Sequence, residues 1–143
     1  MKLELTHRGD YAIRAMLALA EAGSRQLSAG EIGDRMRIPS SYVGQVMADL
    51  SRAGLARAAL GRRGGYRLAR QPLAITLLDV VRASGSDGRR TVCVLRGSPC
   101  ADGGHCQVHG AFADAEVALL AVLDGTTLSA VARPPSPAPG GAT

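Results

Sequence analysis

The sequence has no tryptophan, and aromatic residues make up only 3% of its 143 residues. Hydrophobic residues still account for 46%, so the core must be aliphatic, which suits short and closely packed helices. No stretch approaches the roughly 20 uninterrupted apolar residues of a membrane-spanning helix. Charges interrupt the apolar pattern of the N-terminus, which argues against a signal peptide. These absences predict a cytoplasmic protein with no membrane partner.

The sequence also lacks the local motifs of common enzymes. It contains no phosphate-binding glycine loop, no H-E-x-x-H zinc motif and no Ser/His/Asp set placed by a local motif. Lys and Arg outnumber Asp and Glu, 17 against 12, which gives a formal net charge of +5. We therefore predict a protein that is not an enzyme and that has a polyanionic partner.

The positive charge is confined to the first part of the chain. Residues 1–84 contain 13 Lys and Arg against 7 Asp and Glu, whereas residues 85–143 contain 4 against 5. This asymmetry is typical of a nucleic-acid-binding module joined to a second functional region. The turn-rich sequence at residues 84–88 marks the expected boundary between them.

Two short helices separated by a tight turn are predicted within residues 28–54. Ser28 and Glu31 form a capping-box pattern at the start of the first helix. The sequence Arg-Ile-Pro at 37–39 breaks it, and Ser40 or Ser41 is expected to cap the second, which ends at Gly54. This pattern predicts a helix-turn-helix, although an ordinary helical hairpin would give the same signal.

A basic hairpin is predicted directly after these helices. Residues 55–60 and 66–70 can form strands on either side of a glycine-rich turn. Between residues 50 and 78 the chain has six arginines and no acid, whereas a solvated face is normally mixed in sign. We predict a mainly α protein with a small β-hairpin wing, which binds DNA bases through the second helix and phosphates through the wing. The predicted DNA-binding residues are Ser40, Ser41, Tyr42, Gln45, Arg57, Arg62, Arg63 and Arg67.

A long helix is predicted near the C-terminus, and together with the short terminal helix that follows it spans residues 107–132. Its apolar residues Val108, Phe112, Ala115, Leu119 and Val122 follow an a/d spacing. The stripe spans only about two heptads, so the helix needs a partner surface. A second copy in a homodimer is favoured over packing on the chain's own domain. Residues 133–143 are predicted to be a disordered tail.

All three cysteines lie between the two predicted regions, in residues 85–109. With His109 they give the spacing C-x6-C-x5-C-x2-H, formed by Cys93, Cys100 and Cys106. Structural zinc sites more often use shorter spacings, whereas loops of this length can wrap around an iron–sulfur cluster. Cys106 and His109 share a face at the start of the long helix. An iron–sulfur cluster is favoured, with zinc in a Cys3His site as the alternative.

The chain resembles the IscR/NsrR family of bacterial transcription regulators, in the Rrf-two superfamily. The resemblance covers residues 1–131 and depends on the sequences THRGDYAIRAML, IPSSYVGQVMADLSRAGL, GRRGGYRLAR and ITLLDVVRA, together with the three-cysteine loop. It implies a winged-helix homodimer, often a repressor, with a cluster that senses iron–sulfur status, nitric oxide or redox state. We predict such a regulator; the alternative is a DNA-binding regulator with structural zinc and no sensing role.

The resemblance also implies roles for individual residues. The three cysteines match the cluster ligands, and His109 matches the fourth ligand of the IscR branch, which holds a 2Fe–2S cluster. Asp10 matches the carboxylate that reaches a 4Fe–4S cluster from the partner subunit in an NsrR-type member. Ser41 and Gln45 match base-reading positions. Gly44 replaces a glutamate of the IscR branch, so the dual site specificity of that branch is not implied. The first cysteine gap is also one residue longer than in that branch.

Overall fold

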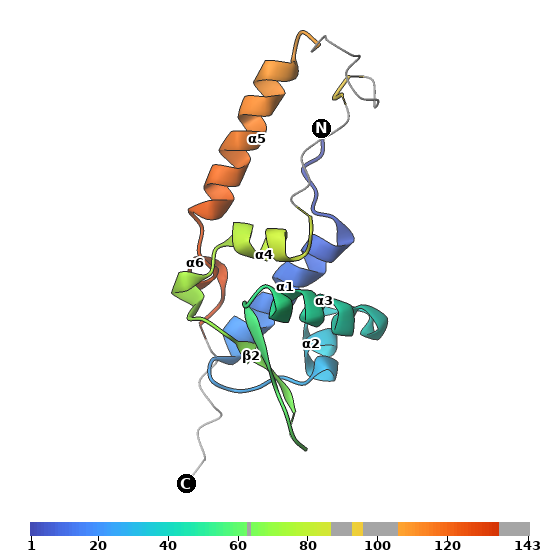
Figure 1. Ribbon diagram of the computed structural model, residues 1–143, viewed down its shortest axis with the longest axis vertical. Coiled ribbons are helices and arrows are strands. Elements are labelled where there is room, and N and C mark those ends of the chain that lie inside the picture. Colours follow the sequence, from blue (N-terminus) through green and yellow to red (C-terminus); the bar gives the residue numbers. More distant parts are fainter. Residues whose placement is uncertain (63, 87–92, 96–105, 135–143) are drawn as a thin grey trace.

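The structure is a computed structural model that describes residues 1–62, 64–86, 93–95 and 106–134. It confirms the predicted mainly α architecture with one two-stranded antiparallel sheet. In Figure 1, α1 to α4 and the hairpin are gathered into one body, from which α5 projects. The elements are α1 His7–Ala22, α2 Ala29–Met36, α3 Ser40–Arg52, β1 Ala56–Ala59, β2 Gly65–Leu68, the 3-10 helix η1 Pro72–Ala74, α4 Leu77–Ala83, α5 His109–Asp124 and α6 Leu128–Val131.

The first helix is the centre of the packed body. Thr6 caps it by accepting a hydrogen bond from the amide of Gly9 at 3.1 Å, and Gly23 ends it with a φ of 62°. Its fully buried side chains include Met16 and Leu19, and the helix contacts α2, α3 and α4. Only glycine reaches such a positive φ at little cost, so the chain can reverse directly into α2.

The turn between α2 and α3 forms as predicted, but the caps of these helices differ in detail. Ser28 accepts from the amide of Glu31, while the Glu31 carboxylate pairs with Arg25 at 2.8 Å instead of completing a capping box. The prediction that Ser40 or Ser41 caps α3 is wrong: Pro39 is the N-cap, without a side-chain hydrogen bond. Both serines lie in the first turn of α3 and are exposed.

The hairpin is held against the helices by its second strand. Arg57 pairs with Arg67 across the sheet, and Tyr66 exchanges two backbone hydrogen bonds with Leu27, of 2.7 and 3.0 Å. A Cβ on Gly65 would lie only 2.7 Å from the carbonyl oxygen of Leu27, so this approach requires glycine. The wing is therefore joined to the segment between α1 and α2 by main-chain contacts.

The last short helix packs on the DNA-binding domain. Leu128 is fully buried in the common core, and its amide donates to the carbonyl of Ile75 at 2.7 Å. Thr76 caps α4 with a complete capping box and bridges to Thr127. The sequence analysis grouped this short helix with the dimerisation helix. In the structure, its Leu128 side chain packs in the core of the domain formed by residues 1–84. Figure 1 shows α6 beside the body and α5 extending from it.

No described helix has both the length and the apolar character needed to cross a membrane. The predicted tail at residues 133–143 falls almost entirely outside the described residues, which end at residue 134.

Candidate functional site

Helix α3 presents a polar surface to solvent and buries its apolar side. Val43, Val46 and Met47 are buried, whereas Ser41 and Gln45, one helical turn apart, are exposed on the outer surface. Tyr42 is 49% exposed, and its ring lies 5.4 Å from the ring of Tyr11 in α1. The structure therefore places the predicted base-reading side chains where a second macromolecule can reach them.

A buried carboxylate lies directly behind this surface. Asp49 of α3 is only 6% exposed and accepts a hydrogen bond from the Arg8 guanidinium of α1 at 2.6 Å. Its other oxygen accepts from Gln45 Nε2 and from Arg52 Nη1, each at 3.3 Å. We call these four residues the Asp49 cluster. It joins the start of α1 to the middle of α3 and contacts one of the predicted base-reading side chains.

The charges around Asp49 determine its ionisation. Burial by itself raises the pKa of Asp49, but the hydrogen bond and charge of Arg8, aided by Gln45 and Arg52, outweigh burial and hold the pKa below its ordinary value. The carboxyl group is therefore ionised at neutral pH. An ionised carboxylate can accept hydrogen bonds but cannot donate one.

This lowered pKa predicts how folding stability depends on acid. A carboxyl group with a lowered folded-state pKa stabilises the fold above its unfolded-state pKa, and this contribution is lost as the pH falls through the folded-state value. The difference in unfolding free energy between wild type and Asp49→Asn should be constant from pH 7 to about 5 and shrink below about pH 4. Urea unfolding at several pH values measures it, and an unchanged difference at low pH would contradict the assignment.

The wing carries arginines without acidic partners. Arg57 and Arg67 lie directly opposite each other on the two strands, an arrangement of like charges that destabilises a hairpin. No carboxylate pairs with Arg57, Arg62 or Arg67 among the described residues. An anionic partner would relieve this repulsion. Arg63 lies outside the described residues.

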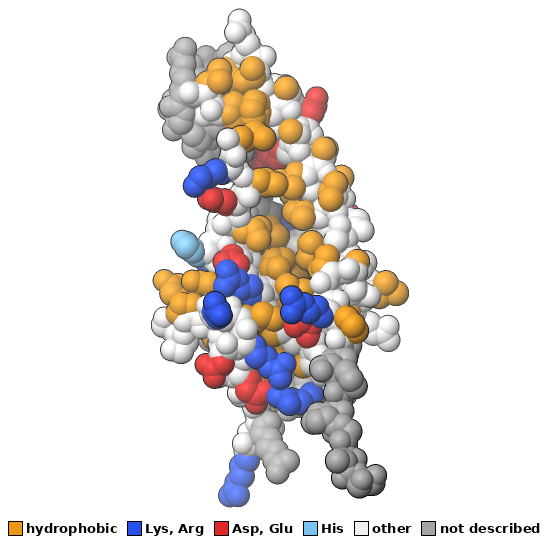
Figure 2. All heavy atoms as spheres, turned by 180° about the vertical axis from the view of Figure 1, so that it is seen from behind, with side chains coloured by type: hydrophobic (Ala, Val, Ile, Leu, Met, Phe, Trp, Pro, Cys, Tyr) orange, Lys and Arg blue, Asp and Glu red, His pale blue; other side chains and the backbone are white. Residues whose placement is uncertain are grey.

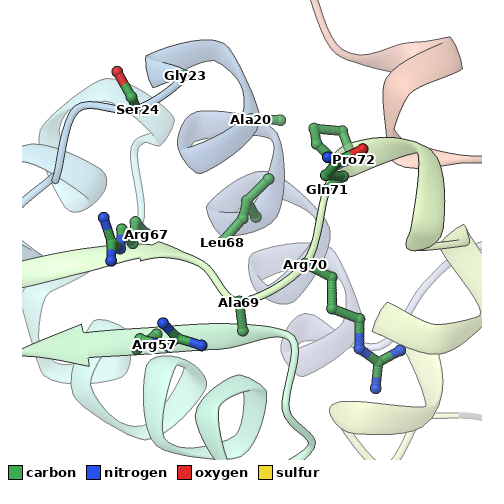
Figure 3. Close-up of a pocket in the computed structure, with 10 residues that line it drawn as sticks. All are labelled: Ala20, Gly23, Ser24, Arg57, Arg67, Leu68, Ala69, Arg70, Gln71 and Pro72. Atoms are coloured by element: carbon green, nitrogen blue, oxygen red, sulfur yellow. The ribbon is translucent and has the colours of Figure 1, made fainter.

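The strand arginines border a pocket of about 380 Å³ between the end of α1 and the wing. Figure 3 shows Arg57 and Arg67 on neighbouring strands and Arg70 extending away from them. Arg70 also lines a second pocket together with Asp79 and Arg82. On the face drawn in Figure 2, basic side chains lie on the body of the molecule rather than along α5. On this face, the exposed positive charge thus lies mostly on the packed body and not on α5.

The cysteine segment lies between α4 and α5, and the structure describes part of it. Cys93 is 8% exposed and Cys106 is half-buried, while Cys100 lies outside the described residues. The amide of His109, the first residue of α5, donates to the carbonyl of Cys106 at 3.0 Å. Within the described ranges, no three His, Cys, Asp or Glu side chains are close enough together to hold a metal ion.

The donors are nevertheless of the right chemical type for a thiolate-ligated centre. Cys106 and His109 lie at the N-terminus of α5, whose cap residue Val108 provides no side-chain hydrogen bond and whose first turn has no acid. Its amide groups and the positive end of its dipole would stabilise an anionic group bound there. Thiolates and imidazole are ligands of both iron–sulfur clusters and zinc. The residues present therefore fit such a group.

The alternative fourth ligand, Asp10, is already engaged. Its two carboxylate oxygens accept from Arg14 Nε at 2.8 Å and Nη2 at 3.0 Å. Arg14 also donates to the carbonyl of Met36 at 3.2 Å, which connects α1 to the end of α2. Asp10 would have to leave a two-bond ion pair to bind a metal, whereas His109 lies three residues from Cys106.

The arrangement of α2, α3 and the basic hairpin defines a winged helix-turn-helix protein. A family model described as an iron-dependent transcriptional regulator, Rrf2, matches residues 5–134. The chain belongs to the Rrf2 family of DNA-binding transcriptional regulators.

Several relatives are similar over most of this chain. The HTH-type transcriptional regulator IscR of Aliivibrio salmonicida is 32% identical over 88% of this chain and 75% of its own length. An rrf2-like HTH-type regulator of Rhodobacter capsulatus is 27% identical, covering 94% and 95%. These relatives are named as transcriptional regulators and not as enzymes, so the predicted class is confirmed.

Solved structures show the same fold. CymR (YrzC), described as the global cysteine regulator of B. subtilis, superposes with a TM-score of 0.75 and 26% identity, over 92% of this chain and 97% of that one. IscR of T. potens gives a TM-score of 0.71 and 30% identity, over 91% and 86%. The predicted fold class and the resemblance to IscR are both confirmed.

Proposed function

We propose that this chain is a cytoplasmic regulator whose affinity for its operator is controlled by an iron–sulfur cluster. Cys93, Cys100, Cys106 and His109 would hold the cluster. The observation that carries the proposal is the position of these donors in the chain: the three cysteines follow α4, which packs on the DNA-binding domain, and precede α5, of which His109 is the first residue. A change in the segment would act on both.

DNA would be bound by two elements of each subunit. Helix α3 would enter the major groove, with Ser40, Ser41 and Gln45 at base edges and Tyr42 beside them. The wing would place Arg57, Arg62, Arg63 and Arg67 on phosphates. The exposed outer surface of α3 and the lack of acidic partners for the described wing arginines support this assignment.

Helix α5 would join two subunits into a homodimer. None of the residues of α5 is buried, although the helix is apolar on all sides; its polar residues and glycine are His109, Gly110, Asp114, Glu116 and Asp124. A helix that is apolar all round is normally covered. A second copy of α5 is the simplest cover, and a homodimer would place two α3 helices on successive half-sites.

The structure offers a physical connection from the cysteine segment to α3. Ser86, the last described residue before the segment, contacts the hydroxyl of Thr6, the cap of α1. Two residues further on, Arg8 binds Asp49 of α3. When bound, a cluster would supply electron transfer and reactivity towards oxidants and nitric oxide, which makes iron–sulfur status, nitric oxide or redox state the proposed signal.

We favour a 2Fe–2S cluster over 4Fe–4S, because His109 is local while Asp10 is held by Arg14. IscR is among the named relatives, which also supports the His109 assignment. The alternative is structural zinc in the same Cys3His set, with no sensing role, because three thiolates and an imidazole suit zinc equally well.

Removing the thiolates should change operator affinity. A Cys93/Cys100/Cys106→Ala variant should lose cluster absorbance and bind its operator with an affinity altered by roughly 5–150-fold, the usual range of allosteric coupling. Iron, sulfide and visible absorbance are measured on anaerobically isolated protein, and affinity by fluorescence anisotropy. Asp10→Ala, compared with His109→Ala, identifies the fourth ligand. A colourless zinc protein whose triple variant binds DNA normally would favour the structural alternative.

A further inference from the structure

We propose that Asp49 fixes the side-chain amide of Gln45 so that α3 selects an adenine in the major groove. This inference rests on the proposed base-reading role of Gln45. It assigns to Asp49 a positioning role, because its buried carboxylate acts on DNA only through Gln45. It also names the base that the pair would recognise.

The first step is the direction of the hydrogen bond between the two side chains. Gln45 Nε2 lies 3.3 Å from Asp49 Oδ1. Because an ionised carboxylate can only accept, the Gln45 oxygen cannot occupy this position. The positions of the oxygen and nitrogen of a side-chain amide are assigned from its hydrogen-bond partners. Here the partner, Asp49, can only accept, so the nitrogen of Gln45 must face it.

The second step is what remains available on the exposed side of Gln45. One N–H is used by Asp49, which leaves the second N–H and the Oε1 acceptor for a partner. Adenine presents the matching pair in the major groove, an N7 acceptor and an N6 amino donor. Guanine presents two acceptors at the same edge, so it would face the Gln45 oxygen with an unfavourable contact.

The third step is the support that holds Asp49 in place. Arg8 reaches it from α1 at 2.6 Å, and Arg52 reaches it from the next turn of α3 at 3.3 Å. The side chain of Asp49 is only 7% exposed, whereas that of Arg8 is 55% exposed. Water therefore competes weakly for the acceptor, and the amide of Gln45 is oriented before DNA arrives.

The test uses the full chain, reconstituted anaerobically, and a pool of double-stranded DNA with randomised sequence. Wild type should select adenine at one position of each half-site, and Gln45→Ala should lose this preference. The Asp49→Asn side chain keeps the shape of aspartate but can either donate a hydrogen bond to Gln45 or accept one, so the Gln45 amide is no longer fixed. The ratio of adenine to guanine affinity at that position should therefore fall about tenfold. In a Gln45→Ala background, Asp49→Asn should change the ratio no further.

Arg25→Met is the matched control, because it breaks an arginine–carboxylate pair, with Glu31 at 2.8 Å, that lies outside the Asp49 cluster. It should keep the adenine preference even if the protein becomes less stable. If Asp49→Asn alone does not fold, the double variant Arg8→Met/Asp49→Asn also removes Arg8, which would otherwise be a cation without its carboxylate partner. This double variant should show the same loss of adenine preference.

Three results would overturn the inference. Adenine preference retained in the folded Asp49→Asn protein, or lost equally in Arg25→Met, would reduce Asp49 to a structural residue while Gln45 still reads bases. Preference retained in Gln45→Ala would overturn the base-reading role as well, although salt-sensitive binding through the wing would remain. Failure of the wild type to enrich any sequence would overturn the proposed function together with the inference.

Discussion

Raising the salt concentration from about 50 to about 200 mM should weaken DNA binding by roughly 10³-fold or more. Each subunit has four arginines assigned to the wing contact, Arg57, Arg62, Arg63 and Arg67. A homodimer would thus neutralise about eight phosphates and release their counterions, which places it in the range where this loss is expected. Arg57 and Arg67 face each other without acidic partners, so phosphate would also relieve their mutual repulsion.

Fluorescence anisotropy of a labelled duplex over a series of salt concentrations measures this slope. Arg57→Ala or Arg67→Ala should weaken binding to all sequences about equally and reduce the slope by about 1 for each phosphate that is no longer neutralised. Arg25→Ala is the matched control, because Arg25 already pairs with Glu31 at 2.8 Å and should leave the slope unchanged. DNA binding that does not depend on salt would contradict the proposed contact between the wing arginines and DNA phosphates.

Val122→Glu should convert the proposed homodimer into monomers and lower operator affinity by about 10²–10⁴-fold. Val122 is 66% exposed on α5, and a buried glutamate without a partner would be too costly for an apolar interface to retain. The second half-site would then no longer be bound at the high effective concentration that a joined subunit provides. Size-exclusion chromatography with light scattering and DNA titration measure the two effects.

Asp114→Asn controls for a general effect of substitution on α5. Asp114 is exposed and lies outside the a/d stripe that contains Phe112 and Val122, about 120° around the helix from the centre of that stripe. This variant should remain dimeric and bind the operator as wild type does. A dimer that survives Val122→Glu would assign the apolar surface of α5 to a different contact.

Most of the fold was predictable because its signals are local. The Thr6 cap, the Gly23 stop, the break at 37–39 and the Thr76 cap all depend on residues within a few positions of each other. The alternating wing strands were predictable for the same reason. The prediction that a serine caps α3 failed because Pro39 takes the position just before the helix, which leaves both hydroxyls free of this role.

Contacts between distant parts of the chain were not predictable. Arg8 lies in the first turn of α1, yet it binds Asp49, 41 residues away. The sequence did contain one signal, since Asp49 falls among the buried residues of α3 with Gln45 four positions before it and Arg52 three after. Leu128 is another case, because no local pattern indicates that a residue beyond α5 fills the core of the first domain.

The sequence suggests which residues form the candidate site, but it does not predict the contacts that hold them. Sequence spacing identified the cysteines and His109, and the resemblance added Asp10. Only the folded structure reveals that Arg14 holds both oxygens of Asp10. Likewise, Gln45 was predicted to read bases and Asp49 lies four residues after it in α3, but the contact of Asp49 with Arg8 depends on the packing of α1 against α3.

The close approach of Gly65 to Leu27 restricts how a signal can alter DNA recognition. With no room for even a methyl group and two main-chain hydrogen bonds across the contact, the hairpin cannot swing independently of the helices it leans on. Within one subunit, α3 and the wing must therefore move together as one rigid body. In the proposed dimer, a regulatory event would therefore change the distance between the DNA-binding domains of the two subunits. Operators with altered half-site separation should then differ in the order of their affinities between the two sensor states.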